Sequence, residues 1–350
     1  MKRIVELDII KALAIIMVVI GHTSCPSLIG QMFYLIHVPL FFMVSGYTCK
    51  DDSNFYSVES LRHFFIKRIS SLYIPFLKYV LPIVLCHNIL YSIGVYNVHF
   101  TFKDYSFQVC RTLLMSIGNE EPLLRQMWFL KVLLLTEIYY SFIVYISNKI
   151  CVPKYYILGS IYLVVFFIDS SSLNHVYIMN IYLPFKAMLY YNVGTIVKNY
   201  FPISTIKKRI IPFILFSGVW ILSAYFIRTS FQESSHSTAI YQLLLTLSAF
   251  YAISAFPFLI LPMYIQRKLQ NLGGRTMIIF CWHYAVFLLI SIIYVLLKGE
   301  ELYVLRDNCR IINVPWWCFS FCGILIPYFL YRLKYVVINS NFSKSTKRIG

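Results

Sequence analysis

Two residues that could take part in proton transfer or anion binding, Lys11 and His22, lie eleven positions apart in the first apolar stretch of the chain. At about 100° and about 1.5 Å per residue, this spacing predicts two side chains on one helix face, roughly 16 Å apart along the axis. An imidazole with a pKa of about 6.5 is largely neutral at pH 7 and can remove a proton from a hydroxyl group. The pattern therefore predicts a functional polar face, with His22 as general base and Lys11 as a second catalytic residue.

Each of these two residues also has a plainer interpretation. Lys11 follows Asp8 by three positions, so it could pair with that carboxylate or extend its ammonium group to the lipid headgroups. His22 could simply hydrogen-bond a backbone carbonyl at the end of its helix. The sequence leaves these alternatives open.

Other ionisable side chains also lie in apolar stretches, where a charge near a bilayer midplane costs about 2.5–3.5 kcal/mol. His37 lies two residues before Pro39, and a proline in a helix frees backbone groups that often face a cavity. Glu137 and His283 are costly in lipid, so each is predicted to face the interior of a helix bundle. Either could orient His22, bind an acceptor or belong to a structural polar pair.

These residues need helices to position them, and the composition indicates membrane helices. Hydrophobic residues make up 59% of the 350 positions, charged residues only 13%, and the mean hydropathy is +0.70. A soluble globular protein is not this apolar. The chain is predicted to be an all-α integral membrane protein, a single domain over 1–350 and a bundle of about ten transmembrane helices. The ten predicted spans, each near the length needed to cross about 30 Å of hydrocarbon, are 8–27, 29–49, 73–95, 127–147, 155–169, 182–198, 211–228, 239–263, 277–297 and 315–333.

The net charge of +17 follows the predicted topology and forms no single basic patch. Most Lys and Arg residues fall in the inside segments, and this asymmetry predicts cytoplasmic N- and C-termini. Nucleic-acid binding is therefore unnecessary to explain the charge, and the expected partner is the lipid bilayer. The longest outside loop, 96–126, could be a connection or a cover over an outer mouth. The outside loops hold these basic residues: Lys103, Arg111, Arg125, Arg228, Lys298, Arg306 and Arg310.

The sequence shows no metal-binding motif and no nucleophile motif. No Cys-x-x-Cys pair occurs among the nine cysteines, and no metal site is predicted. Cys110 and Cys309, in predicted outer loops, could form a disulfide in an oxidising compartment. No Gly-x-Ser-x-Gly motif surrounds Ser45, so Ser45 and Gly46 are expected to allow close helix packing.

Six blocks, in order along the chain, resemble the successive signatures of the acyltransferase 3 family, and the fucose 4-O-acetylases are the most similar branch. Lys11 and His22 match the family's Arg/Lys-x10-His spacing. The Arg-x-x-Arg pair of many members is represented by Arg68 alone, because Ser71 occupies its second position. The blocks are LDIIKALAIIMVVIGHTS, LIHVPLFFMVSGYTCK, RHFFIKRISSLYIPF, WFLKVLLL, LPFKAMLYYNVGTIVKN and LGGRTMIIFCWHYAVF.

This resemblance implies an integral-membrane enzyme that acylates sugar hydroxyls. The implied donor is an acyl-CoA, whose phosphates would be held on the inside by Arg68, Lys67 and Arg62, although these could be ordinary positive-inside charges. Trp128 opens the WFL block, where an indole could stack on a sugar ring or anchor the helix at the membrane surface.

The function predicted from the sequence is that of a multi-pass inner (plasma) membrane O-acetyltransferase. It would move acetyl from acetyl-CoA, used as a substrate and with no bound cofactor, to a hydroxyl of a cell-surface carbohydrate or its lipid-linked precursor. Direct transfer, an acyl-histidine relay and homo-oligomerisation are all left open. The alternative is a transporter of lipid-linked sugar or a small metabolite, since polar residues in a bundle also mark transport paths. A non-catalytic membrane partner is a third possibility, but it would not require Lys11 and His22 on one face.

Overall fold

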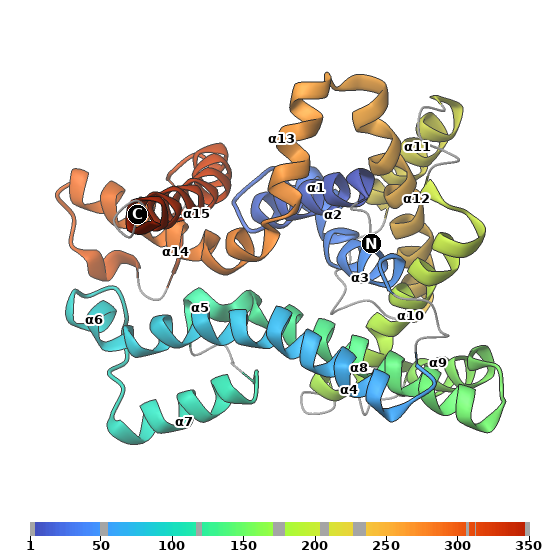
Figure 1. Ribbon diagram of the computed structural model, residues 1–350. Helices are drawn as coiled ribbons and strands as arrows, with labels where there is room; N and C mark the ends of the chain where they lie inside the picture. The colour runs from blue at the N-terminus through green and yellow to red at the C-terminus, as the bar shows by residue number, and fades with distance from the viewer. Residues whose placement is uncertain are drawn as a thin grey trace.

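The computed structural model describes residues 4–49, 55–116, 121–170, 179–203, 210–226, 236–305, 308–311 and 313–346, and all regular structure in these ranges is helical (Figure 1). The α-helices are α1 Val5–Gly21, α2 Ser27–Tyr34, α3 His37–Tyr47, α4 Val58–Arg68, α5 Ile74–Leu85, α6 His87–Ser92, α7 Phe102–Leu113, α8 Trp128–Ile150, α9 Lys154–Ser170, α10 Met179–Tyr200, α11 Ile210–Phe226, α12 His236–Ile260, α13 Met263–Gly273, α14 Thr276–Leu297 and α15 Trp316–Thr346.

The all-α membrane architecture expected from the sequence is confirmed. Each of the ten expected spans overlaps a helix, and six helical segments among the described residues are long and apolar enough to cross a bilayer. The total number of crossings stays a prediction. Arg228 and Arg306, two of the expected outside cations, lie outside the described residues. The six segments are Ser27–Tyr47, Val58–Ser92, Pro122–Ile150, Ile240–Ile260, Thr276–Leu297 and Trp316–Leu333.

The first helix ends earlier than expected, at Gly21 and not at residue 27. His22 is its C-cap, and the backbone N–H of Thr23 bonds the carbonyl of Ile20 at 2.9 Å, which closes a tight turn. Pro26 is the N-cap residue of α2. Because proline has no backbone N–H, it would also interrupt any continuation of α1 to this position. The early end places His22 at a helix terminus.

The second expected span, 29–49, is two helices. The break between α2 and α3 falls at Leu35 and Ile36, where the backbone of Ile36 has φ −128°. Pro39 lies in the first turn of α3, where its missing N–H is tolerated. The break places His37 at the start of α3.

The third expected span, 73–95, belongs to a longer helical segment. A π-helical turn, Ile69–Tyr73, joins α4 to α5, and π turns often occur at functional sites. The loop expected at 96–126 is not irregular, because it contains α7 and a 3₁₀ turn, Pro122–Met127. Residues 117–120 of this loop lie outside the described residues.

Helix pairs approach closely at glycines. A Cβ at Gly46 of α3 would overlap the backbone carbonyl of Tyr191, and one at Gly194 of α10 would overlap that of Met43. Gly273 of α13 meets the carbonyl of Asp8 in α1 in the same way. Close backbone packing suits membrane helices because lipid gives little hydrophobic force between them. The expectation that Ser45-Gly46 permits close packing is confirmed.

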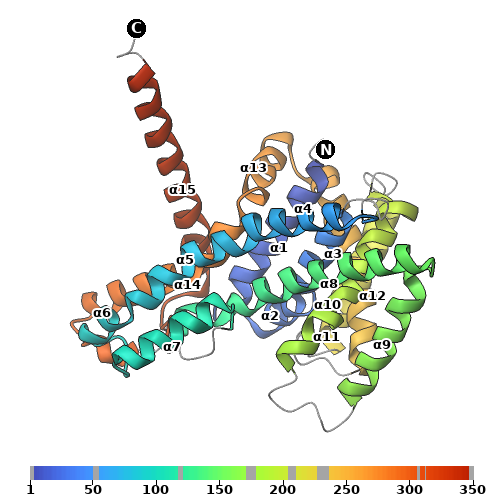
Figure 2. The ribbon, with the colours of Figure 1, turned by 60° about the horizontal axis from the view of Figure 1, so that its bottom comes forward.

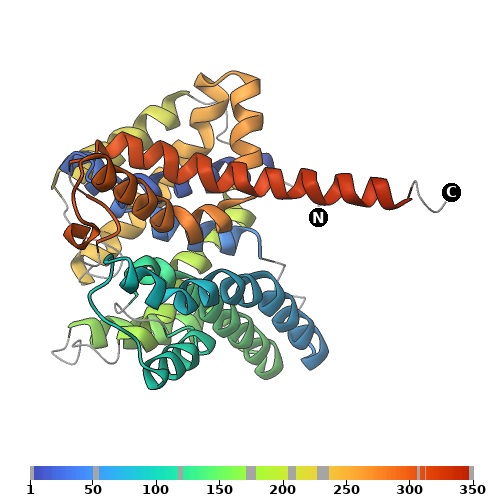
Figure 3. The same ribbon diagram turned by 90° about the vertical axis from the view of Figure 1, so that its left-hand side faces the viewer.

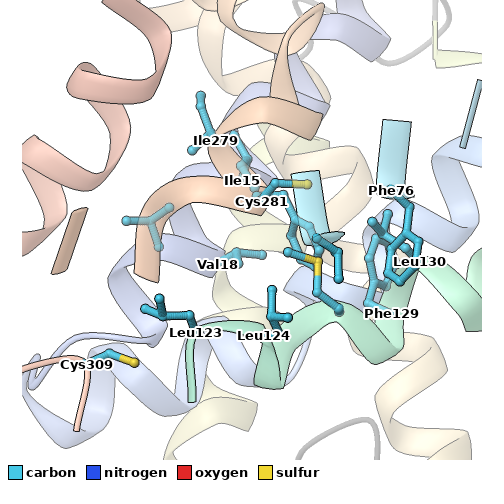
Figure 4. Close-up of a cluster of buried hydrophobic side chains, with 14 of the residues drawn as sticks. Ile15, Val18, Phe76, Leu123, Leu124, Phe129, Leu130, Ile279, Cys281 and Cys309 are labelled. Carbon is cyan, nitrogen blue, oxygen red and sulfur yellow. The ribbon is translucent and has the colours of Figure 1, made fainter. Parts of the chain in front are cut away.

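The largest apolar cluster joins α1, α5, α8 and α14 (Figure 4). Ile15 of α1, Phe76 of α5, Leu130 of α8 and Ile279 of α14 are all buried within it. This packing fixes the relative positions of the helices that carry the candidate site.

The beginning of α1 and the end of α15 lie at the same end of the molecule, where α15 projects beyond the other helices (Figures 2 and 3). An even number of crossings gives this arrangement. Which end faces the cytoplasm stays a prediction from the charge distribution.

Candidate functional site

Three histidines from three helices converge at one place. His22 ends α1, His37 begins α3 and His283 lies in α14. The His22 ring is 5.5 Å from that of His283, nearly parallel at 22°, and 6.4 Å from that of His37, at 80°. His37 and His283 are buried, with 4% and 0% exposure, whereas His22 is partly exposed. We call these three residues the histidine cluster.

Two tyrosine hydroxyls lie beside His22. The Tyr284 hydroxyl is 3.1 Å from His22 Nδ1, and the Tyr34 hydroxyl is 3.4 Å from the same nitrogen. Tyr284 follows His283 directly, and Tyr34 lies at the end of α2, three residues before His37. A hydroxyl can donate to this nitrogen or accept from it, so the tyrosines can fix the orientation of the His22 ring in either tautomer.

The partners of the two buried histidines determine which nitrogen carries the hydrogen in the neutral ring. His37 Nδ1 lies 2.5 Å from the carbonyl of Phe33, and His283 Nδ1 lies 2.9 Å from that of Phe280. A carbonyl oxygen only accepts, so each Nδ1–H donates and each Nε2 keeps its lone pair. The Nε2 of His283 is buried with no hydrogen-bond partner among the described residues. Two imidazoles beside His22 therefore present basic nitrogens.

An arginine also reaches the histidine cluster. The Nη1 of Arg310, from the segment that precedes α15, donates to the backbone carbonyl of His22. This carbonyl lies at the C-terminus of α1, where a positive charge complements the helix dipole. The site thus combines neutral bases with one guanidinium group.

An aromatic wall covers one side of the cluster. Phe129 of α8 packs against Phe42 at 5.3 Å and against Phe280 at 5.4 Å between ring centroids. Phe280 in turn lies 6.2 Å from His283. Apolar walls lower the local dielectric and strengthen electrostatic interactions inside the site. Trp128, which is partly buried, packs edge-on against Phe129 at 6.4 Å.

A second polar group joins three helices. The Nε of Arg68, at the end of α4, lies 3.0 Å from Oε2 of Glu137 in α8, and the hydroxyl of Ser45 in α3 donates to Oε1. The guanidinium of Arg68 also lies 4.9 Å from the ring of Phe64. Glu137 is 1% exposed and Arg68 about one-fifth exposed. Ser45 lies eight positions after His37 on α3, so this group is about 12 Å along the helix from the histidine cluster.

The remaining predicted site residues lie apart from both groups. Lys11 pairs with Asp8 at 2.7 Å, so the plainer interpretation of Lys11 describes an observed contact. Lys11 lies eleven positions before His22, about 16 Å along the axis of α1. Lys67 and Arg62 are exposed on α4, whereas their neighbour Arg68 turns toward Glu137. Roles for Lys11, Lys67 and Arg62 stay predictions.

Sequence reasoning missed Tyr34, Tyr284 and Arg310. The one available signal was that Tyr34 and Tyr284 lie close in the sequence to His37 and His283. The disulfide that Cys110 and Cys309 could form in an oxidising compartment is not present in the structure, where Cys110 is an exposed thiol on α7 and Cys309 is a buried thiol. In the part of the chain that the structure describes, no three His, Cys, Asp or Glu side chains are placed to hold a metal ion.

A known family matches nearly the whole chain. The family model of the acyltransferase 3 group, described as an acyltransferase domain, matches residues 4–332. No curated protein and no solved structure matches the chain. The match includes both the histidine cluster and the Arg68–Glu137 pair.

Proposed function

This chain belongs to the acyltransferase 3 family and is a membrane acyltransferase, and we propose that it transfers an acetyl group from acetyl-CoA to a hydroxyl of a cell-surface glycan or its lipid-linked precursor. The observation that carries this proposal is the convergence of His22, His37 and His283 from three helices. The fucose 4-O-acetylase branch and a location in the inner (plasma) membrane are parts of the same proposal.

In the proposed reaction His22 is the general base. This role requires the tautomer in which Nδ1–H donates to the Tyr284 hydroxyl, 3.1 Å away, and Nε2 keeps its lone pair. Nε2 takes the proton of the acceptor hydroxyl as the acceptor oxygen attacks the thioester carbonyl. The carbon–sulfur bond then breaks, the acetyl ester forms, and the imidazolium returns the proton to the departing CoA sulfur. A positioned base of this kind contributes about 10²–10⁴-fold in rate.

Arg310 is proposed to stabilise the negative charge that develops on the thioester carbonyl oxygen. Its bond to the His22 backbone carbonyl anchors the guanidinium beside the base. An arginine has five N–H donors, so this bond leaves donors for an oxyanion. Preorganised donors at such positions are worth about 10²–10³-fold in other acyl-transfer enzymes.

Donor binding is assigned to the Arg68–Glu137 group. The Glu137 carboxylate fixes the Arg68 Nε, which orients the planar guanidinium toward a phosphate of CoA. Lys67, Arg62 and Lys11 add positive charge on the side where acetyl-CoA is present. The helical separation of about 12 Å between this group and the histidine cluster suits an extended donor whose phosphates and thioester are far apart.

The acceptor is proposed to bind at the histidine cluster from the opposite side. The lone pairs at Nε2 of His37 and His283 can accept hydrogen bonds from sugar hydroxyls. Trp128 is proposed to offer a face for stacking on a sugar ring, near the aromatic wall.

The experiment that tests this function measures CoA release by the purified protein in liposomes. Acetyl-CoA should be consumed only when a glycan or lipid-linked sugar acceptor is added, and the acetyl group should appear as an ester on that acceptor. If no acceptor stimulates CoA release while the protein moves the sugar across the liposome membrane, the chain is a transporter and the proposal is wrong.

A further inference from the structure

A buried glutamine contacts the backbone just before His37. Gln242 of α12 is 0% exposed, and its Nε2 donates to the carbonyl of Leu35 at 3.0 Å. Its Oε1 accepts a hydrogen bond of 3.0 Å from the hydroxyl of Tyr190 in α10, which is also 0% exposed. Because the Leu35 carbonyl can only accept, the orientation of the Gln242 amide is determined by its partners. We call Tyr190, Gln242 and the Leu35 carbonyl the glutamine relay.

The sequence explains why this carbonyl needs a side-chain donor. In an α-helix the carbonyl of residue 35 would accept from the backbone N–H of residue 39. That residue is Pro39, which has no N–H. Leaving a buried carbonyl without a partner is costly, so a donor from another helix is favoured. Gln242 supplies that donor at the break between α2 and α3.

The break is also where the histidine cluster begins. His37 lies two residues after Leu35, directly after the break, and its Nδ1–H donates to the carbonyl of Phe33 in the last turn of α2. The orientation of the His37 ring therefore depends on the backbone geometry that the glutamine relay holds. Tyr34, beside His22, is the last residue of α2 and directly precedes the break.

From this arrangement we infer that Gln242, supported by Tyr190, is a positioning residue of the active site, which holds the α2–α3 break so that His37 and Tyr34 face His22. Gln242 touches neither His22 nor His37 in this scheme and acts through the backbone. This inference rests on the proposed function and adds two residues from α10 and α12 to the catalytic apparatus.

The first test replaces Gln242 by methionine, which has a similar length and no donor. Turnover per folded enzyme should fall about 10–100-fold, since displacements near 1 Å cost up to about 10²-fold, while KM for acetyl-CoA should remain near the parental value. Gln266→Met is the matched control, because Gln266 of α13 donates in the same way to the carbonyls of Pro257 and Leu261. The inference is overturned if folded Gln242→Met turns over at the parental rate. It is also overturned if total activity falls only in proportion to the amount of folded protein.

A second variant tests the reason for the relay. Pro39→Ala restores a backbone N–H that is expected to reach the Leu35 carbonyl. Gln242→Met should therefore reduce turnover less in the Pro39→Ala protein than in the parental protein. Equal losses in the two backgrounds would show that the Leu35 carbonyl is not what Gln242 serves.

A third measurement does not depend on acyl transfer. Diethyl pyrocarbonate modifies imidazole nitrogens, and mass spectrometry can follow His37 against the exposed His63 of α4 in the same molecule. In Gln242→Met the ratio of His37 to His63 modification should rise, because the ring is no longer held. An unchanged ratio overturns the inference even if the chain proves not to be an acyltransferase. A changed ratio in a chain without acyltransferase activity would instead contradict only the proposed function.

Discussion

At the scale of single residues, the site is a set of imidazole rings held by hydrogen bonds. His37 and His283 each donate Nδ1–H to a backbone carbonyl, and His22 lies within reach of two tyrosine hydroxyls. An imidazole whose second nitrogen is fixed in this way has a defined tautomer and direction. The proposed division of labour, with His22 as base and its neighbours as orienting or acceptor-binding groups, leads to two predictions.

His22→Ala should reduce turnover by about 10²-fold or more, because the general base is lost. The variant should still insert, since replacing a polar residue by alanine makes a span more apolar. CoA release at equal membrane abundance measures the effect, and His63→Ala on the exposed face of α4 is the control. Parental activity in His22→Ala would contradict the role of His22, and His283 or His37 would then be tested as the base.

Tyr284→Phe should lower kcat by roughly 5–10-fold with little change in KM, which corresponds to one hydrogen bond of about 1–1.5 kcal/mol. The ring stays and only the hydroxyl near His22 is lost. Tyr34→Phe should have a smaller effect, because its hydroxyl lies farther from the same nitrogen, at 3.4 Å. Steady-state kinetics on both variants test this order, and a larger loss in Tyr34→Phe would contradict the assignment of Tyr284 as the main partner of His22.

At the scale of helices, three interruptions position the site. The early end of α1 places His22, the break between α2 and α3 places His37, and the π turn after α4 follows Arg68 directly. Close packing at glycines then fixes α3 against α10. The helices therefore carry the chemistry at their ends and irregularities.

Gly194→Ala should destabilise the protein strongly, because the new methyl group would overlap the backbone of α3 at Met43. Overpacking typically costs about 1–3 kcal/mol, and backbone overlap belongs at the upper end of that range. Gly159→Ala in α9 is the matched control, since a Cβ there has no neighbour within 4 Å and alanine favours helix by up to about 1 kcal/mol. Thermal unfolding in detergent should separate the two variants, and equal melting temperatures would contradict the observed α3–α10 contact.

The start of α7 should respond to pH. Two hydrogen bonds from Thr101 hold the pKa of the Asp104 carboxyl below its ordinary value. A lowered folded-state pKa means that this contribution is present above the ordinary value, near 3.9, and disappears as the pH falls through the folded pKa. The melting temperature of Asp104→Asn should therefore lie below the parental one at pH 7, and the difference should shrink as the pH falls below the ordinary value and through the folded pKa. A difference that stays constant down to the lowest pH at which the protein folds would show that charge is not the cause.

At the scale of the whole molecule, the polar groups are arranged along the helices. The histidine cluster and the Arg68–Glu137 group are separated by about 12 Å on α3, a separation that suits the proposed reaction, in which donor and acceptor arrive from different sides. This arrangement depends on the orientation of the bundle in the membrane. The distribution of Lys and Arg predicts that orientation.

Reporter fusions test the predicted orientation directly. Fusions after Lys208 and at Gly350 should report the cytoplasm, whereas fusions at Asp104 and Glu300 should report the opposite side. Reversal at any two of these four positions would contradict the ten-span topology.

The sequence alone determined the class of the protein and singled out most residues of the candidate site. Composition is sufficient for a membrane bundle, and a histidine or glutamate in an apolar stretch stands out because lipid makes it costly. His22, His37, His283 and Glu137 were all identifiable for this reason. The acyltransferase 3 signatures were equally readable, because they are local blocks of sequence, and the family match confirms them.

Only the tertiary structure decided which of these residues meet. Tyr34 and Tyr284 are two of 29 tyrosines, and Arg310 is one of 31 basic residues, so residue type alone does not distinguish them. The contacts of Tyr284 and Arg310 with His22 join residues 262 and 288 positions apart in the chain. Lys11 is the opposite case, since both its place on α1 and its ion pair with Asp8, three residues earlier, can be read from the local sequence. Spacing along one helix fixes distance along its axis, whereas a site is made by the packing of several helices, which the sequence pattern of each helix does not contain.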